Sequence, residues 1–295
     1  MTGKIVKALS GFYYVNDGNT VYECKARGSF RKSGISPLVG DTAEFEPLTD
    51  NTGTVTAINP RKSFLLRPPV ANIDRLFIVS AHDNPSPNTF LIDKITAIAL
   101  WSGIEPVVVF NKCDVGDFEE LRRIYSSIPF LTLTVSAKTG EGLDRLREEL
   151  KGRTSAFTGN SGVGKSSILN ALYPNLALPT GNISEKLGRG KHTTRHTELF
   201  SLPQGGYVAD TPGFSSVGYE GFEYEFKEKL VQSFPDIDAY SDNCRFSSCT
   251  HTCEKGCNVI SAVSNGLINE SRHNSYVALF NELKEFKPWN TAKRK

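Results

Sequence analysis

One stretch of the chain has the residue types and spacing that bind phosphate groups. It reads Gly159-Asn160-Ser161-Gly162-Val163-Gly164-Lys165-Ser166-Ser167, which satisfies the pattern G-x-x-x-x-G-K-[ST]. A short β-prone segment precedes it, and a helical pattern follows. In that context backbone N–H groups surround the phosphates, Lys165 reaches the β- and γ-phosphates, and the Ser166 hydroxyl suits Mg²⁺. We therefore expect a nucleoside triphosphate site; a glycine-rich turn with a solvated lysine is the alternative.

Two further loops have side chains that can select a base. The segment Asn111-Lys112-Cys113-Asp114 follows one apolar strand pattern, and Ser136-Ala137-Lys138 follows another. The Asp114 carboxylate can accept hydrogen bonds from N1–H and the 2-amino group of guanine, whereas adenine offers neither donor. Asn111 suits the O6/N7 edge, the Lys112 stem can cover the ring, and a backbone N–H near Ala137 can bond O6. These residues predict a guanine site.

A third group of residues is predicted to read the γ-phosphate and Mg²⁺. Asp210-Thr211-Pro212-Gly213 follows a short strand, so the Asp210 carboxylate can hold Mg²⁺ and the Gly213 N–H can bond the γ-phosphate. The glycine-rich segment before it contains Thr193 and Thr194, and we favour Thr194 as the Mg²⁺ ligand.

The residue after Gly213 is Phe214, which cannot orient a water molecule by hydrogen bonding. We therefore expect slow intrinsic hydrolysis that a partner accelerates. His192 and His196 are the candidates for orienting the water; the sequence does not choose between them.

Four of the six cysteines crowd into 14 residues near the C-terminus. The spacing Cys244-x₄-Cys249-x-His251-x₅-Cys257 offers three thiolates and one imidazole, a closed set typical of structural zinc, with Cys253 as a fifth candidate. A cysteine-rich loop without metal is the alternative.

Length and composition limit the kind of protein. A chain of 295 residues with 39% hydrophobic and 22% charged residues predicts a globular protein of two or three domains. The formal net charge is +2, so any nucleic-acid surface has to be a local patch. No apolar run has membrane length. We expect a cytoplasmic, monomeric protein with no membrane partner.

The elements that must position these groups fall into three parts. Residues 1–65 contain five β-like runs at 4–9, 12–15, 20–26, 41–46 and 52–58, which suggest a small barrel of the OB type. Its basic loop, 25–32, includes Phe30 and suits RNA contact, with Phe30, Tyr13 or Tyr14 available for stacking; a solvated loop is the alternative.

Residues 66–222 alternate strand and helix, as in a parallel sheet covered on both faces. Residues 223–295 hold the cysteine cluster and a helix near 269–286, with Tyr276, Phe280, Leu283 and Phe286 on one stripe and a basic end after it.

The order of the motifs resembles a known family. Base-reading loops precede the phosphate loop, threonines and Asp210–Gly213, an order found in the circularly permuted GTPases. With a barrel before and a Cys/His cluster behind, the chain resembles the RsgA (YjeQ/YloQ) family, ribosome small-subunit-dependent GTPases. The resemblance covers essentially the whole chain. It implies GTP and GDP as ligands, Mg²⁺, one structural Zn²⁺ on Cys244, Cys249, His251 and Cys257, and the small ribosomal subunit with its rRNA as partner.

We therefore expect a three-domain GTPase that assists late assembly of the small ribosomal subunit and is stimulated by it. Two other classes remain open. A nucleotide-gated RNA-binding scaffold would bind GTP with negligible turnover, and a P-loop ATPase or kinase would prefer ATP.

Overall fold

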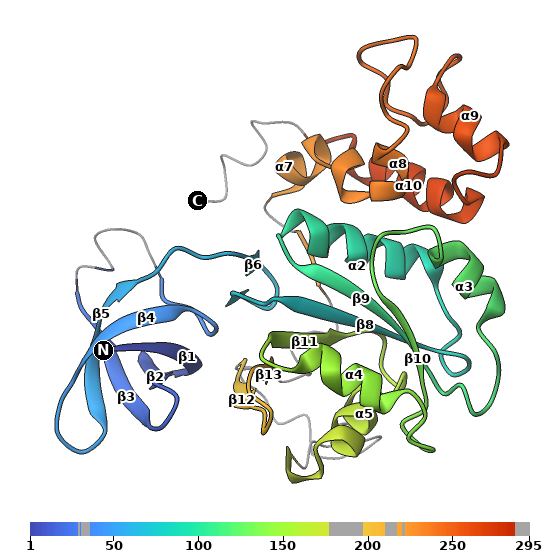
Figure 1. Ribbon diagram of the computed structural model, residues 1–295. Helices are drawn as coiled ribbons and strands as arrows, with labels where there is room; N and C mark the ends of the chain where they lie inside the picture. Colours follow the sequence, from blue (N-terminus) through green and yellow to red (C-terminus); the bar gives the residue numbers. More distant parts are fainter. Residues whose placement is uncertain (29, 31–35, 177–196, 210–216, 220–221, 287–295) are drawn as a thin grey trace, which may run out of the picture.

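The chain folds into a barrel, a central sheet with helices, and a helical C-terminal part, as the sequence predicts (Figure 1). The computed structural model describes residues 1–28, 30, 36–176, 197–209, 217–219 and 222–286. Within these ranges, no helix is both long and apolar enough to cross a bilayer.

The N-terminal part is a closed five-stranded barrel in the order β1-β2-β3-β5-β4. Its strands are β1 (Thr2–Leu9), β2 (Phe12–Asn16), β3 (Val21–Ala26), β4 (Thr42–Pro47) and β5 (Thr52–Ile58). All five predicted runs are strands. Alternate side chains fill the interior, with Ile5, Val15 and Val55 fully buried.

Phe30 lies in this barrel core and is only 9% exposed, so its expected role as an RNA-stacking residue is wrong. Tyr14 is partly exposed, and its hydroxyl donates a hydrogen bond to Glu23 at 2.9 Å. Phe30 thus packs inside the barrel, whereas Tyr14 packs against the core of the neighbouring central part. A small barrel has room for few large side chains, and the ring of Phe30 is used as one of them.

The central sheet has the strand order β10-β9-β8-β11-β13-β12. Its strands are β8 (Arg75–Ala81), β9 (Glu105–Asn111), β10 (Thr132–Val135), β11 (Thr154–Thr158), β12 (Leu199–Ser201) and β13 (Tyr207–Ala209); a short hairpin of β6 (Phe64–Leu65) and β7 (Val70–Ala71) precedes them. The first five strands in that order are parallel, and β12 is an antiparallel edge that no sequence pattern indicated. Because the strands are parallel, the loops after β9, β10 and β11 meet at one edge.

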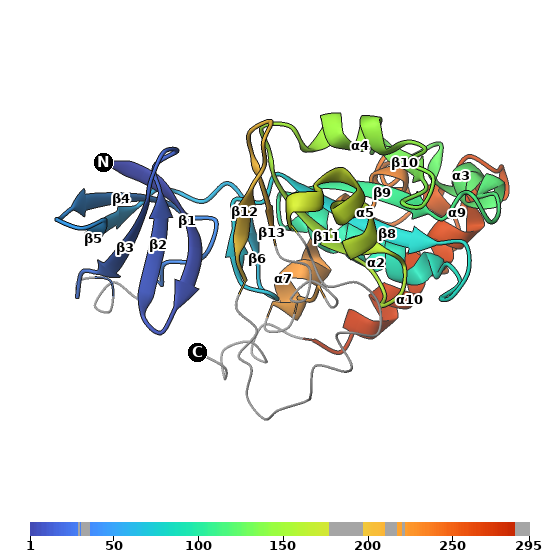
Figure 2. The same cartoon turned by 90° about the horizontal axis from the view of Figure 1, so that it is seen from below.

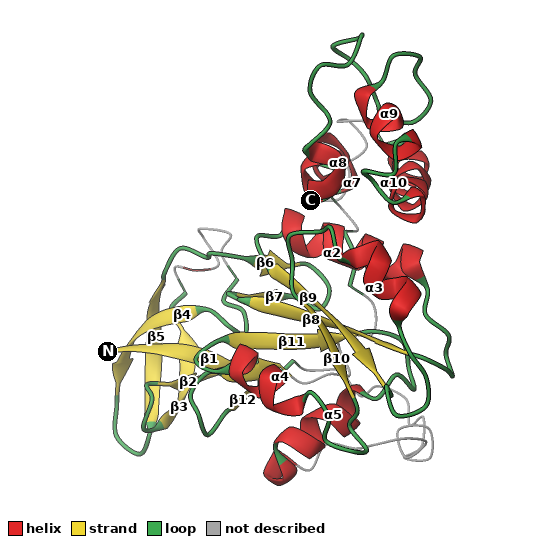
Figure 3. Ribbon diagram, turned by 45° about the vertical axis from the view of Figure 1, so that its right-hand side comes forward, coloured by secondary structure: helices red, strands yellow, loops and turns green. Residues whose placement is uncertain are grey.

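Helices cover both faces of the sheet (Figures 1 and 3). One face carries α2 (Thr89–Trp101) and α3 (Glu119–Tyr125), and the other carries α4 (Leu143–Leu150) and α5 (Lys165–Leu172), after which a 3₁₀ turn spans Pro174–Leu176. The Asn88 side chain caps α2 by accepting from the Leu91 N–H at 3.0 Å. Strand β8 is buried along its whole length, as expected for a strand covered on both sides.

The C-terminal part is helical and packs on α2 (Figure 3). It comprises α7 (Glu223–Glu228), a 3₁₀ turn at Val231–Ser233, α8 (Pro235–Asp238), α9 (Asn258–Ser264) and α10 (Glu270–Leu283). The predicted apolar stripe of α10 is confirmed only in part. Tyr276 and Leu283 are buried, but so are Leu279 and Arg272, which the stripe did not include.

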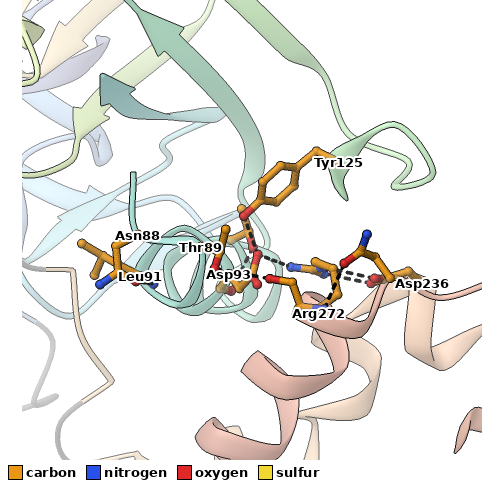
Figure 4. Close-up of polar contacts among 10 residues, drawn as sticks. Asn88, Thr89, Leu91, Asp93, Tyr125, Asp236 and Arg272 are labelled. Atoms are coloured by element: carbon orange, nitrogen blue, oxygen red, sulfur yellow. Dashed lines mark hydrogen bonds and ion pairs between the residues drawn. The ribbon is translucent and has the colours of Figure 1, made fainter. Parts of the chain in front are cut away.

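A buried ion network holds this part against the central domain (Figure 4). Arg272 on α10 donates to both carboxylate oxygens of Asp236 at 3.0 and 2.8 Å, and to Asp93 Oδ1 on α2 at 2.7 Å. The Tyr125 hydroxyl donates to the same Asp93 oxygen at 2.7 Å. Arg272 and Asp93 are 1% and 0% exposed. A buried charge without a partner is strongly destabilising, so each of these two groups needs the opposite charge of the other.

The barrel contacts the other edge of the sheet (Figure 2). Lys7 on β1 forms a backbone bridge and an ion pair of 2.9 Å with Glu198, the residue before β12. Lys4 donates to the Thr154 hydroxyl at 2.8 Å and lies over the Tyr207 ring. The first strand of the chain thus rests on the hairpin β12–β13.

We predict that Arg272→Met lowers the free energy of unfolding by about 3–5 kcal/mol, because it leaves Asp93 and Asp236 buried without their cation. Urea unfolding measures the change. Arg123→Met, which removes an exposed pair with Glu119 on α3, is the matched control and should cost under about 0.5 kcal/mol. Equal effects of the two changes would contradict the prediction.

Candidate nucleotide-binding site and metal centre

The phosphate loop joins β11 to α5 in a conformation that requires glycine. Gly159, Gly162 and Gly164 have φ of +133°, +87° and +94°. A Cβ on Gly159 would lie 2.2 Å from the Val79 carbonyl oxygen. A Cβ on Gly164 would lie 2.3 Å from Asn111 Nδ2. The second contact places the loop directly against the predicted base-reading segment.

Lys165, at the first position of α5, folds back on this loop. Its ammonium donates to the carbonyl oxygens of Gly159 at 2.8 Å and Asn160 at 2.9 Å. Burial lowers the pKa of Lys165. A phosphate anion at the loop offers this half-buried cation a stronger acceptor than two neutral carbonyls. Ser166 and Ser167 follow in the first turn of the helix.

Asn111, the last residue of β9, ties the loops together. Its Nδ2 donates to the Val163 carbonyl in the phosphate loop at 2.8 Å, and its Oδ1 accepts from the Ala137 N–H at 3.1 Å. Asn111 is 2% exposed. The side chain was expected to bond the O6/N7 edge of guanine, but its oxygen and one amide hydrogen are already bonded within the protein. Only the second amide hydrogen remains for a ligand.

Asp114 is held by the loop after β10. The Ser136 hydroxyl donates to Asp114 Oδ1 at 2.7 Å, and the exposed Lys138 ammonium lies 3.6 Å from Oδ2. The hydrogen bond from Ser136 and the nearby Lys138 lower the pKa of the Asp114 carboxyl. The group is therefore ionised at neutral pH, as an acceptor for two N–H donors must be.

The loop that follows β8 is a third support of the site, which the sequence motifs did not indicate. Lys112, at φ +69°, donates its ammonium to the carbonyl oxygens of Asp83 at 2.9 Å and Asn84 at 3.2 Å. The Asn84 carbonyl also lies close to Gly162. Strand β8 lies between β9 and β11, so its loop must fall between the two motif loops. This loop could have been predicted only from the strand order, which the motifs do not encode.

Of the predicted base-reading residues, Asn111 contacts the phosphate loop directly and Ala137 is joined to it through Asn111. Asp114, Ser136 and Lys138 contact one another, and Lys112 contacts the loop after β8. The remaining predicted residues lie outside the described ranges. They are Thr194, His192, His196, Asp210 and Gly213.

The cysteine cluster has the dimensions of a tetrahedral metal site. One ligand atom each of Cys244, Cys249, His251 and Cys257 lies within 4.8 Å of the others. His251 Nδ1 is 3.6 Å from Cys244 Sγ and 3.5 Å from Cys257 Sγ, and these sulfurs are 3.9 Å apart. A zinc tetrahedron with Zn–S of about 2.3 Å and Zn–N of about 2.0 Å has edges of about 3.5–3.8 Å.

The surroundings orient these ligands. The Asn258 N–H donates to Cys244 Sγ at 3.3 Å, and the His251 carbonyl is hydrogen-bonded to His273 Nε2 at 2.7 Å. Cys253 is exposed and is not one of the four clustered residues. The donor set therefore fits a structural metal, because four protein ligands leave no position for a substrate.

A phosphate loop beside base-reading loops that precede it in the chain defines the class of circularly permuted P-loop GTPases. Comparisons with known proteins agree. The RsgA GTPase family pattern matches residues 58–220, and the RsgA N-terminal domain pattern matches residues 2–55.

Relatives and solved structures match along nearly the whole chain. The sequence is 45% identical to the small ribosomal subunit biogenesis GTPase RsgA of Caldanaerobacter subterraneus subsp. tengcongensis, over 96% of each chain. The fold is similar to YjeQ from Thermotoga maritima, with TM-score 0.83, 36% identity, and coverage of 97% and 99% of the two chains. It is also similar to YloQ, a circularly permuted GTPase, with TM-score 0.79, 36% identity, and coverage of 97% and 96%. The chain belongs to the RsgA family and is a GTP hydrolase.

We predict that Gly164→Ala reduces GTP affinity at least tenfold, because the added methyl group collides with the Asn111 amide that joins the two loops. Isothermal titration with GDP and GTP measures the loss. Gly152→Ala is the matched control, since Gly152 has φ +68° but an added methyl group there would meet no atom within 4 Å. Unchanged affinity for Gly164→Ala would contradict the prediction.

We further predict that Cys257→Ser lowers the zinc content well below one ion per chain and destabilises the C-terminal helices, because a tetrahedral site loses a thiolate. Cys253→Ser should retain one ion. Elemental analysis of purified protein and thermal unfolding test both. The assignment of the ligands fails if Cys253→Ser loses the metal and Cys257→Ser keeps it.

Proposed function

We propose that this chain binds GTP across the loops after β9, β10 and β11, hydrolyses it, and acts on the small ribosomal subunit during its biogenesis. The observation that carries the nucleotide assignment is the Asn111 side chain, which bonds the phosphate loop at Val163 and the base loop at Ala137. Loops far apart in the sequence are thus joined by one side chain.

The base end of the site would select guanine. Asp114, oriented by the Ser136 hydroxyl, accepts from N1–H and the 2-amino group. The free Nδ2 hydrogen of Asn111 faces the O6/N7 edge. The Lys112 stem, anchored at the Asp83 and Asn84 carbonyls, covers one face of the ring. A carboxylate left without its donors explains why adenine is rejected.

The phosphate end would bind and align the triphosphate. Backbone N–H groups of 159–167 surround the α- and β-phosphates, and Lys165 exchanges its loop carbonyls for the β- and γ-phosphates. Ser166, Thr194 and Asp210 would hold Mg²⁺, which neutralises developing charge on the phosphates when bound. His192 or His196 orients the attacking water, and Gly213 bonds the γ-phosphate.

The Cys/His cluster would bind one structural zinc ion. Zinc fixes the segment 244–257 in front of α10, where Arg272 docks the whole part on α2. The partner in this proposal is the small subunit and its rRNA, supported by the names of the relatives. The protein acts as a monomer in the cytoplasm.

One experiment tests the proposal against both other classes. GTP and ATP hydrolysis are measured with and without purified small ribosomal subunits. We expect slow GTP turnover that subunits accelerate. Preference for ATP would indicate a kinase or ATPase, and GTP binding without turnover on subunits would indicate a scaffold.

We predict that Asp114→Asn weakens GTP binding by about 10³-fold or more and favours xanthosine triphosphate, whose C2 carbonyl accepts the new amide donor. Competition of labelled GTP by the two nucleotides measures the switch. Asp117→Asn, an exposed carboxylate on the same loop, is the control and should leave guanine preference unchanged. Retention of guanine preference in Asp114→Asn would show that another group reads the base.

A further inference from the structure

A groove of about 290 Å³ lies where the barrel linker, the end of α2 and the start of α7 meet. None of its lining residues belongs to the nucleotide loops or the cysteine cluster described above. Its lining is Arg61, Lys62, Ser63, Phe64, Leu66, Trp101, Ser102 and Phe222. Three of these eight residues are aromatic, and none is a carboxylate.

The aromatic rings present surface to solvent. Phe222 is 41% exposed, and Trp101 is partly exposed. Their ring centroids are 6.3 Å apart with planes inclined at 57°. The Trp101 ring also packs against Phe226, with the two centroids 5.4 Å apart. Aromatic rings that line a groove and are open to solvent can stack on the flat face of a ligand ring.

Polar groups around these rings favour an anion with hydrogen-bonding edges. Arg61 lies over the Phe64 ring, but its charge is paired with the Asp41 carboxylate at 2.7 Å, which leaves Lys62 as the cation available to a ligand. Lys62 is exposed, and its ammonium forms no ion pair with the residues that the structure describes. The Trp101 indole N–H and Ser102 hydroxyl also have no hydrogen-bond partner within those residues.

We propose that this groove receives one unpaired nucleotide of an RNA strand. The base stacks on the exposed Phe222 ring with its edge against Trp101, and the adjoining phosphate lies at Lys62. Stacking on exposed aromatics beside cations is how proteins hold single-stranded nucleic acid. The inference rests on the proposed function, which supplies rRNA as the ligand, and adds a contact site outside the barrel.

The test uses the full chain with Trp289→Phe, which leaves Trp101 as the sole tryptophan. A single-stranded RNA oligonucleotide of mixed sequence is titrated while Trp101 emission is recorded. We expect saturable quenching. Phe222→Ala should weaken RNA affinity about fivefold to a hundredfold, the range found for losing one stacked base. Lys62→Glu should weaken it and reduce its salt dependence.

Leu267→Ala and Lys151→Glu are matched controls, because both residues are exposed and lie on other parts of the molecule. Both should retain wild-type affinity. Thermal unfolding within a few degrees of wild type shows that Phe222→Ala still folds. Absence of quenching, or an affinity of Phe222→Ala equal to that of Leu267→Ala, overturns the proposal.

Other occupants give different results. If removal of residues 287–295 changes Trp101 emission without RNA, the tail of this chain fills the groove and the proposal is wrong. If Phe222→Ala weakens binding to intact small subunits but not to the RNA oligonucleotide, the occupant is a protein and the proposal is again wrong. Subunit-stimulated GTP turnover of the wild-type chain, measured in parallel, reports on the proposed function separately.

Discussion

The site depends on one amide group. Asn111 is buried at the end of β9 and uses its nitrogen on the phosphate loop and its oxygen on the base loop. These loops come from three parallel strands, so each alone could shift with its own strand. The amide fixes the distance between the loops before a ligand binds. Binding therefore loses less conformational entropy than it would if the loops had to be ordered by the ligand. The close approach of Gly164 leaves no room for a side chain there.

The same dependence on a few buried polar contacts recurs where the C-terminal part meets the sheet. Arg272 joins two carboxylates from α8 and α2, and Tyr125 from α3 completes the network. Lys94 and Tyr219 add a second link through Glu282 at 2.7 Å each. The Cys/His cluster and these ion pairs lie in different parts of one small domain. The cluster brings the ends of the segment 244–257 together, and the ion network fixes where the domain packs against the nucleotide-binding domain.

Sequence patterns predicted what depends on local periodicity and motif spacing. Strand β5 and helix α2 lie where alternation and amphipathicity placed them, and the Cys/His spacing identified four residues that do cluster. Contacts between distant elements left no such pattern. Nothing in the local sequence marked Arg272 or the loop after β8, and the basic residues around Phe30 suggested an exposed ring. The positions of these residues depend on the strand order and on which face another domain covers. Neither the strand order nor the covered face can be predicted from local composition.

The shared core of α2 and α10 has a consequence for how the protein is made. Asp93 and Arg272 are separated by 179 residues. During synthesis the barrel strands, which end at Ile58, can pair early. Helix α2 is made next, and its Asp93 carboxylate and the surface that α10 covers stay exposed until α10 follows. That surface is completed only when α10 has been synthesised. The nucleotide-binding domain therefore reaches its final packing long after its own strands are made, and the nascent chain must remain able to fold until then.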